Sequence, residues 1–252
     1  MAAAREEKQE MAKGGGADFM KLGVGKSVVR ILPPVAGSRS PFRVVHQHFV
    51  RLPTQPGPVV FVCPKMETRS PCPMCERAAK LKSSGNEADR DAAWELMPKR
   101  RVFCNVVDRA HPEDGPKVLA FGKLIHEELV SLRDDEDAGG DYTHPLTGFD
   151  IIIIREGTGK NDTAYKVRRS PKETPLSPDA AEMNGWAEVV VDLEQFARTK
   201  TYAEICELLG ITPERDEAPK KALAAKATTA ARGQRKAATA EGGKDDDDDM
   251  PY

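Results

Sequence analysis

The sequence predicts a mainly β fold with helical insertions, an α+β arrangement built around a small, elaborated barrel. Eight short segments have the apolar, β-branched composition of strands, and only four show the apolar spacing of helices. The two ends of the chain are poor in large apolar residues. With 252 residues, 39% of them hydrophobic and 31% charged, the chain is expected to form one principal core with mobile ends.

The strands are expected in chain order, each bounded by turn-forming or charged residues. They are 27–32, 42–50, 58–62, 101–107, 117–121, 149–155, 164–169 and 187–193. Apolar residues recur three and four positions apart in the segments predicted to be helices, which are 75–82, 88–97, 124–133 and 202–209. Trp94 and Trp186 lie in acidic surroundings and are predicted to belong to the core.

Changes in composition set the expected domain boundaries. Residues 1–17 form a short polar arm that is expected to be flexible, and 18–212 form the core. Residues 213–244 are rich in Ala, Thr, Lys, Arg and Gly and cannot bury enough apolar surface to fold, which predicts a disordered basic linker. An acidic tail follows at 245–252.

The formal net charge of -2 hides a separation of charge along the chain. Residues 18–172 carry 25 basic and 20 acidic residues, whereas 173–212 carry two basic and eight acidic residues. The linker is basic again, and five aspartates follow it. The core should therefore attract a polyanion, although the charge of the whole chain does not indicate this.

Cellular location follows from two absences in the sequence. No apolar stretch approaches the roughly 20 residues that a membrane helix needs. The start, MAAAREEKQEMAKGGG, lacks the apolar run of a secretory signal. The sequence predicts a cytoplasmic protein without a membrane partner, in which cysteines are more often metal ligands or buried thiols than disulfides.

Three cysteines have the spacing of zinc ligands. Cys72 and Cys75 form a C-x-x-C knuckle with Pro71 and Pro73 on either side of Cys72, and Cys63 can supply a third thiolate from a separate segment. His46 and His48 lie two apart in a strand pattern and point to the same face, so either is a plausible fourth ligand. The set predicts one structural Zn²⁺, because four protein ligands leave no open position for a reactive water.

The remaining cysteines and histidines have no other potential metal ligands at zinc-site spacing. Cys104 and Cys206 lie in apolar strand and helix patterns and are predicted to be core residues. His111, His126 and His144 have no companion cysteines and are predicted to be surface groups.

A zinc-dependent nucleic-acid enzyme of the deaminase type is an alternative, because PCPMC at 71–75 fits half of the deaminase signature. The other half, an H-x-E whose glutamate transfers protons, is missing, since the chain has His46-Gln47-His48 instead. The sequence therefore predicts a protein that is not an enzyme and has no catalytic residues.

The run from about residue 19 to about residue 169 resembles the single-stranded DNA-binding, or helix-destabilising, proteins of T-even-type and related bacteriophages. The resemblance rests on VVRILP at 28–33, Pro41-Phe42, His48-Phe49, Cys63 and the CPMC knuckle at 72–75. It covers more than half of the chain, and the cysteine spacing is its most specific part.

The resemblance implies an OB-like barrel with an inserted zinc subdomain at about 46–80 and a basic cleft for DNA. It further implies that His48, Cys63, Cys72 and Cys75 hold the zinc. In this family the N-terminal arm serves cooperative self-association on DNA, and the acidic tail binds replication and recombination proteins. The arm of this chain, AREEKQE, departs from that pattern because its charges balance.

Clusters of cations and aromatic rings independently predict binding to single-stranded DNA. Single strands are held by cationic grooves and by rings on which bases stack. Alternation from 164 to 169 places Tyr165 and Arg169 on one strand face and Lys166 and Arg168 on the other. The predicted DNA-contacting residues are Lys99, Arg100, Arg101, Phe103, Arg109, Lys117, Phe121, Lys123, Tyr165, Lys166, Arg168 and Arg169.

The final residues, DDDDDMPY, resemble the terminal peptide of bacterial single-strand-binding proteins, in which an acidic stretch precedes a Pro-aromatic tip. The predicted partner-binding residues are Asp245, Asp246, Asp247, Asp248, Asp249, Met250, Pro251 and Tyr252. Because the aspartates compete with DNA for cations, deletion of 245–252 should strengthen DNA binding at low salt.

Taken from the sequence, the expected function is to bind and protect single-stranded DNA during phage-type replication, recombination and repair. The acidic tail is expected to recruit partner proteins. An RNA-binding zinc protein is a further alternative, because a groove that stacks bases need not exclude a 2′-hydroxyl.

Overall fold

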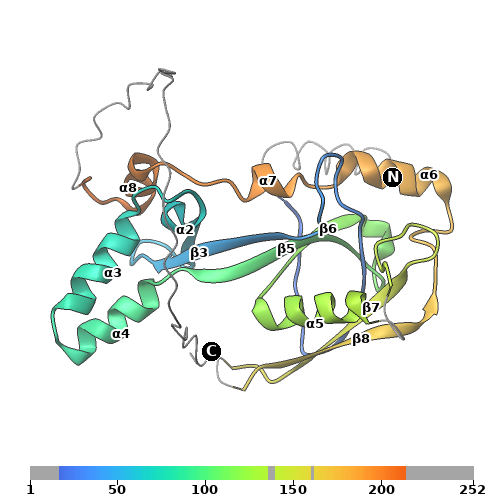
Figure 1. Cartoon of the computed structure of the whole chain (residues 1–252), viewed down its shortest axis with the longest axis horizontal. Helices are drawn as coiled ribbons and strands as arrows, with labels where there is room; N and C mark the ends of the chain where they lie inside the picture. The colour runs from blue at the N-terminus through green and yellow to red at the C-terminus, as the bar shows by residue number, and fades with distance from the viewer. Residues whose placement is uncertain (1–16, 136–139, 160–161, 214–252) are drawn as a thin grey trace, which may run out of the picture. The chain divides into compact units, whose positions relative to one another are not determined.

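A computed structural model describes residues 17–135, 140–159 and 162–213 (Figure 1). These residues belong to the first of two units of the chain, Met1–Glu214, and the second unit is Arg215–Tyr252. The predicted arm up to residue 16, the predicted linker from residue 214 onward and the acidic tail lie outside the described residues.

Eight strands form one mixed sheet. They are β1 (Phe19–Met20), β2 (Gly25–Ile31), β3 (Arg43–Arg51), β4 (Pro58–Val62), β5 (Lys99–Asp108), β6 (Pro116–Phe121), β7 (Phe149–Glu156) and β8 (Ala164–Glu173). The order of hydrogen-bonded neighbours is β1-β6-β5-β2-β7-β8, and β3 pairs with both β4 and β5. Only the short β1–β6 pair is parallel among the named strands, and the other pairs are antiparallel.

Helices occupy two stretches between strands and the segment after the last strand. The helices are α2 (Pro64–Thr68), α3 (Pro73–Ser83), α4 (Glu87–Leu96), α5 (Lys123–Asp134), α6 (Ala180–Val189), α7 (Leu193–Phe196) and α8 (Tyr202–Leu209), with a short 3₁₀ turn at Pro112–Asp114. The fold is therefore a mixed sheet with several helices and roughly equal strand and helix content, which confirms the predicted α+β fold with helical insertions.

The main core lies between the sheet and α5. Ile151 and Ile153 of β7 are buried, whereas Ile152 and Ile154 between them are only partly buried, so the isoleucine run has one face on the core. Ile125 and Leu129 lie four residues apart on α5 and enter the same cluster. Since α5 contacts both β8 and β5, it links two strands that are not neighbours in the sheet.

A second group of elements forms at one end of β3 and β5. In Figure 1, these two strands run side by side toward α2, α3, α4 and α8, which gather at that end. The helices are joined to β3 and β4 by an apolar cluster that includes Phe61, Met74, Ile205 and Leu209. We call β3, β4, α2, α3, α4 and α8 the metal module, for the ligands described below.

Seven of the eight predicted strands are present, but the strand predicted at 187–193 is wrong. Residues up to Val189 continue α6, whose N-cap Asp179 accepts a hydrogen bond from the backbone of Ala181. Val191 then pairs with the side chain of Asn105, which donates to its carbonyl oxygen at 3.0 Å and accepts from its N–H at 3.2 Å. The side chain of Asn105 thus makes the hydrogen bonds to the Val191 backbone that a neighbouring strand was expected to make.

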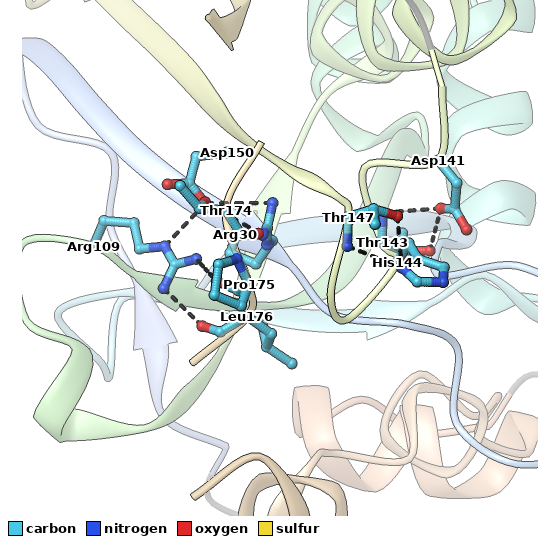
Figure 2. A network of polar contacts seen from close by, with 10 residues as sticks. All are labelled: Arg30, Arg109, Asp141, Thr143, His144, Thr147, Asp150, Thr174, Pro175 and Leu176. Atoms are coloured by element: carbon cyan, nitrogen blue, oxygen red, sulfur yellow. Dashed lines mark hydrogen bonds and ion pairs between the residues drawn. The ribbon is translucent and has the colours of Figure 1, made fainter. Parts of the chain in front are cut away.

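Two arginines fix the crossover from β8 to α6 (Figure 2). Asp150 of β7 lies 2.9 Å from Nε of Arg109 and 3.6 Å from Nη1 of the fully buried Arg30. Arg30 donates to the carbonyl oxygen at 174, and Arg109 donates to those at 175 and 176 at 3.1 and 2.8 Å. Three successive carbonyl groups are thereby held against the sheet, which sets the direction in which the chain returns toward the metal module.

Candidate metal centre and nucleic-acid interface

Four buried side chains of the metal module converge on one point. The ligand atoms of His48, Cys63, Cys72 and Cys75 all lie within 4.8 Å of one another. Cys63 Sγ lies 3.5 Å from Cys75 Sγ, and His48 Nε2 lies 3.4 Å from Cys72 Sγ and 3.6 Å from Cys75 Sγ. The four come from β3, from the residue after β4, from the residue before α3 and from α3 itself.

These separations fit a tetrahedral metal ion. Bonds of about 2.3 Å to sulfur and about 2.0–2.1 Å to nitrogen place ligand atoms roughly 3.6–3.8 Å apart around a tetrahedron. Because three thiols and one imidazole would complete the coordination sphere, the cluster could hold a metal ion as a structural site.

Local chain geometry sets these ligands in place. Cys63 and Cys72 occupy the N-cap positions of α2 and α3, and Pro64 and Pro73 start the helices. At an N-cap, the partial positive charge of a helix N-terminus favours the thiolate form that binds metals. Each of these two prolines therefore begins a helix directly after one of the candidate ligands.

The histidine ambiguity is resolved in favour of His48. His46 is not in the cluster, and its Nδ1 lies 3.1 Å from Oε1 of Glu67, an oxygen that also accepts from the His46 backbone N–H. His48 instead has its Nδ1 2.7 Å from the carbonyl oxygen of Leu96. Since a carbonyl only accepts, Nδ1 of His48 carries a proton, and Nε2 is the nitrogen that faces the cysteines and could bind a metal.

Proton sharing within the cluster agrees with a cation site. Burial lowers the pKa of His48, but hydrogen bonds with Cys63 and Cys72 outweigh it and raise that pKa to about 9. Hydrogen bonds with Cys72 and Cys75 lower the pKa of Cys63, whereas the contacts with Cys63 and Cys72 raise that of Cys75. The donors lie too close together to ionise independently, and a divalent cation would allow all three thiols to lose their protons.

The other predicted cysteines and histidines are accounted for separately. Cys104 and Cys206 are buried core residues, as predicted. His111 and His144 are exposed, whereas His126 is partly buried on α5, where its Nδ1 lies 3.3 Å from Nη2 of Arg100. His126 is therefore not a surface group of the predicted kind, because its ring packs edge-on against Phe42.

The predicted DNA-contacting cations divide into two classes. Five of them form ion pairs within the protein, namely Arg109, Lys117, Lys123, Lys166 and Arg169, with N···O separations of 2.9, 2.8, 3.6, 2.7 and 3.1 Å. Arg109 also donates hydrogen bonds to the carbonyl oxygens at 175 and 176. Arg169 also lies over the ring of Phe149, with 4.2 Å from its Cζ to the ring centroid.

The other four cations have no ion pair with any carboxylate in the part of the chain that the structure describes. They are Lys99, Arg100, Arg101 and Arg168. Three lie at the start of β5, where the chain leaves the metal module, and the fourth lies on β8. We call these four residues the unpaired cations.

Arg101 lies against an aromatic ring of β3. Its guanidinium lies over the ring of Phe49, with 5.3 Å from Cζ to the ring centroid. Burial lowers the pKa of Arg101, and Tyr165 of β8 is close enough to oppose this shift electrostatically. Of the two sequence clusters, Arg101 and Tyr165 are therefore near enough to influence each other electrostatically.

The predicted alternation on β8 is present. Tyr165, Val167 and Arg169 are partly buried, and Lys166 and Arg168 between them are exposed. Tyr165 and Val167 pack against the main core, so Arg168 points away from it.

Two predicted aromatic contacts do not offer a ring to a ligand. Phe103 and Phe121 are 3% and 2% exposed and belong to the core, where Phe103 packs against Phe196 and Phe121 against Phe42. Trp94 was expected in the core but is 48% exposed on α4. Trp186 is buried, as predicted. Sequence reasoning thus missed Trp94 and Phe49 as accessible or cation-contacting rings near the start of β5.

Comparison with known proteins finds a family match. The family described as gp32 DNA binding protein like matches residues 23–210, which is most of the chain. The chain belongs to this gp32-like family. The match confirms the resemblance found in the sequence and identifies a gp32-type single-stranded DNA-binding protein. A search of curated proteins finds no match.

Membership in the gp32-like family also distinguishes a DNA-binding protein from the zinc-dependent enzyme considered above. The family binds DNA and is not enzymatic, so the deaminase alternative is set aside. The four protein ligands around the candidate metal position agree with this, because a metal enzyme needs an open coordination position. Within the described ranges, the gp32-like domain has no helix that is both long and apolar enough to cross a membrane.

Proposed function

We propose that this gp32-like protein holds single-stranded DNA along the unpaired cations Lys99, Arg100, Arg101 and Arg168, with Tyr165 as the neighbouring ring. The observation that carries the proposal is the division of the predicted cations into ion-paired and unpaired groups, with the unpaired group gathered on β5 and β8. A phosphate can neutralise an unpaired cation without first displacing a carboxylate.

The physical logic is that of single-strand binding in general. A row of cations follows the sugar-phosphate backbone, and rings beside it accept bases of any sequence because every base has a π-face. Arg100 and Arg101 supply planar guanidinium groups that match phosphate geometry better than lysine does. The exposed Trp94 lies five residues before the start of β5 in the sequence and offers a further ring.

The metal is proposed to be one Zn²⁺, with a structural role. Thiolate-rich tetrahedral sites with a single imidazole are typical of zinc, and the Nδ1 contact of His48 fixes the required tautomer. Bound zinc would hold α2 and α3 to β3, which gives the metal module the rigidity that its small apolar cluster alone cannot supply.

The wider role is proposed from the composition of the chain and its resemblance to phage proteins. The protein would protect single strands during phage-type replication, recombination and repair in the cytoplasm of an infected host. The acidic, aromatic-tipped segment 245–252 would recruit replication and recombination proteins, and self-association on DNA would accompany binding. A pull-down with and without Met250–Tyr252 tests the recruitment, because the shortened chain should lose its partners and keep its DNA affinity.

The ligand class is tested by fluorescence titration with single-stranded DNA, RNA and duplex DNA across a salt series. We expect the tightest binding to single-stranded DNA, with log affinity falling linearly with log salt. Equal affinity for RNA would favour the RNA-binding alternative. Preference for duplex DNA, or affinity independent of salt, would contradict the proposal.

A further inference from the structure

One face of β3, β4 and the start of β5 is partly exposed, and the strand residues that form this part include no Asp or Glu. On β3 and β4, His48, Val50, Val59 and Phe61 point toward the metal cluster. Strand alternation places Phe49 on the opposite face, where Val60 is its direct cross-strand neighbour. Val60 is 41% exposed, which shows that this part of the sheet face is uncovered.

The same face continues onto the start of β5. Arg101 is paired with Val45 and Lys99 with Gln47 in the β3–β5 register, so both share the face of Phe49. Arg51 lies two residues beyond Phe49 and is exposed. The strand segments 47–51, 58–62 and 99–101 contain no Asp or Glu. We call Phe49, Arg51, Val60, Lys99 and Arg101 the arm face.

We propose that the arm face is a phosphate-binding site for the DNA backbone, in which Phe49 is the positioning residue for the Arg101 guanidinium. This inference rests on the proposed function, and it assigns to Phe49 the positioning of Arg101 within the DNA site. A half-buried arginine without a carboxylate partner is held by a ring instead, which leaves its N–H groups available to an anion.

Burial supports the assignment. Arg101 has its pKa lowered by burial, so its charged form is partly deprived of water and gains more from an added anion than an exposed cation would. The flanking Lys99 and Arg51 are exposed, and they would contribute attraction over a longer range rather than a fixed contact. A ring under the guanidinium restricts its rotation, so less side-chain freedom is lost when the phosphate binds.

The test compares Phe49→Leu with Phe49→Tyr in titrations of a labelled oligothymidylate over a salt series. Phe49→Leu should weaken binding about two- to fivefold, and Phe49→Tyr should restore it because the ring is kept. Arg101→Ala should flatten the log-affinity versus log-salt slope by roughly 0.7. Adding Phe49→Leu to Arg101→Ala should cause no further loss, since the positioned group is already gone.

Two controls separate positioning from damage to the fold. Metal content and thermal midpoint of each variant report whether the metal module is intact, because Phe49 follows the ligand His48 in sequence. Arg77→Ala removes an exposed cation from α3 outside the arm face and should leave affinity and slope near those of the unchanged protein.

If Phe49→Leu does not bind metal, the variant Arg101→Lys provides a second test of the contact between Phe49 and Arg101. Arg101→Lys retains the charge without the planar group that stacks on the ring, and should also lose about two- to fivefold in affinity. Unchanged binding by Arg101→Lys or by a metal-loaded Phe49→Leu would overturn the role of Phe49. In that case DNA binding by the unchanged protein would still support the proposed function, whereas failure of the unchanged protein to bind would contradict the function itself.

Discussion

The Nδ1 atom of His48 lies 2.7 Å from the carbonyl oxygen of Leu96, so this candidate metal ligand is hydrogen-bonded to the last residue of α4. Strand β5 begins only three residues later, at Lys99, with three of the four unpaired cations. Metal binding at Nε2 keeps the proton on Nδ1 and so maintains this hydrogen bond. The metal site and the proposed DNA contacts are therefore linked through a single backbone carbonyl.

The first prediction follows from this link. Removing the metal, or changing Cys72 to Ser, should lower the thermal midpoint by at least about 5 °C, because the free energy of metal binding contributes to folding. Protease sensitivity should rise at 46–80. A chelator should shift the unchanged protein and have little further effect on Cys72→Ser. Equal stability of metal-bound and metal-free protein would contradict the structural role of the metal.

The second prediction concerns the clamp formed by Arg30, Arg109 and Asp150. Asp150→Asn removes the carboxylate that both arginines share and should destabilise the fold by about 3 kcal/mol, because it leaves buried charge uncompensated. Denaturant unfolding measures this loss. A change below about 1 kcal/mol would mean that the arginines are held mainly by the carbonyl groups at 174–176.

The clamp also separates Arg109 from the DNA contacts. Arg109→Ala should lower stability, yet leave the salt dependence of DNA binding unchanged, since its N–H groups are already occupied. A flatter salt slope in this variant would return Arg109 to the DNA interface.

The third prediction uses His126, whose pKa is lowered by burial and then by Arg100, with an opposing influence from Glu127. The unfolded chain takes up a proton near the ordinary pKa of histidine, whereas folded His126 resists until the pH is lower. Stability should therefore fall as the pH drops through about 6.5 and level off below the lowered pKa.

His126→Asn isolates this effect, because the asparagine oxygen can still accept from Arg100 but does not titrate. Urea unfolding at several pH values should show a shallower loss of stability on acidification in the variant than in the unchanged protein. Parallel pH profiles for the two proteins would show that His126 does not titrate in this way.

Local sequence patterns were sufficient to predict most of the sheet and the three cysteines of the cluster that could hold a metal ion. Strands such as β7 and β8 have strong period-two or apolar patterns, and the Cys72–Cys75 knuckle has a spacing that few other structures require. The choice between His46 and His48 could not be made from spacing, because both side chains point to the same strand face. Glu67 decides it by engaging His46, and Leu96 by engaging His48.

The errors arose where a long-range partner overrides local composition. The valines at 189–191 look like a strand until Asn105, more than 80 residues earlier, satisfies the backbone of Val191. Phe103 was predicted to contact DNA but is buried, and Trp94 was predicted to be buried but is exposed. The sequence does not show that α7 covers Phe103 or which side of α4 is exposed. Ion pairing cannot be predicted from the local sequence either. Arg109 is paired with Asp150 of another strand, whereas Arg168 has no carboxylate partner among the described residues.

The most direct test of the account compares two double variants that each remove two positive charges. Arg101→Ala with Arg168→Ala removes unpaired cations, whereas Lys123→Ala with Lys166→Ala removes cations paired with Glu127 and Glu156. The measurement is the slope of log affinity for single-stranded DNA against log salt. We predict that the first variant flattens the slope by about 1.4, from two lost phosphate contacts, and that the second changes it by less than half as much. Equal changes in the two variants would contradict the claim that the unpaired cations form the DNA site.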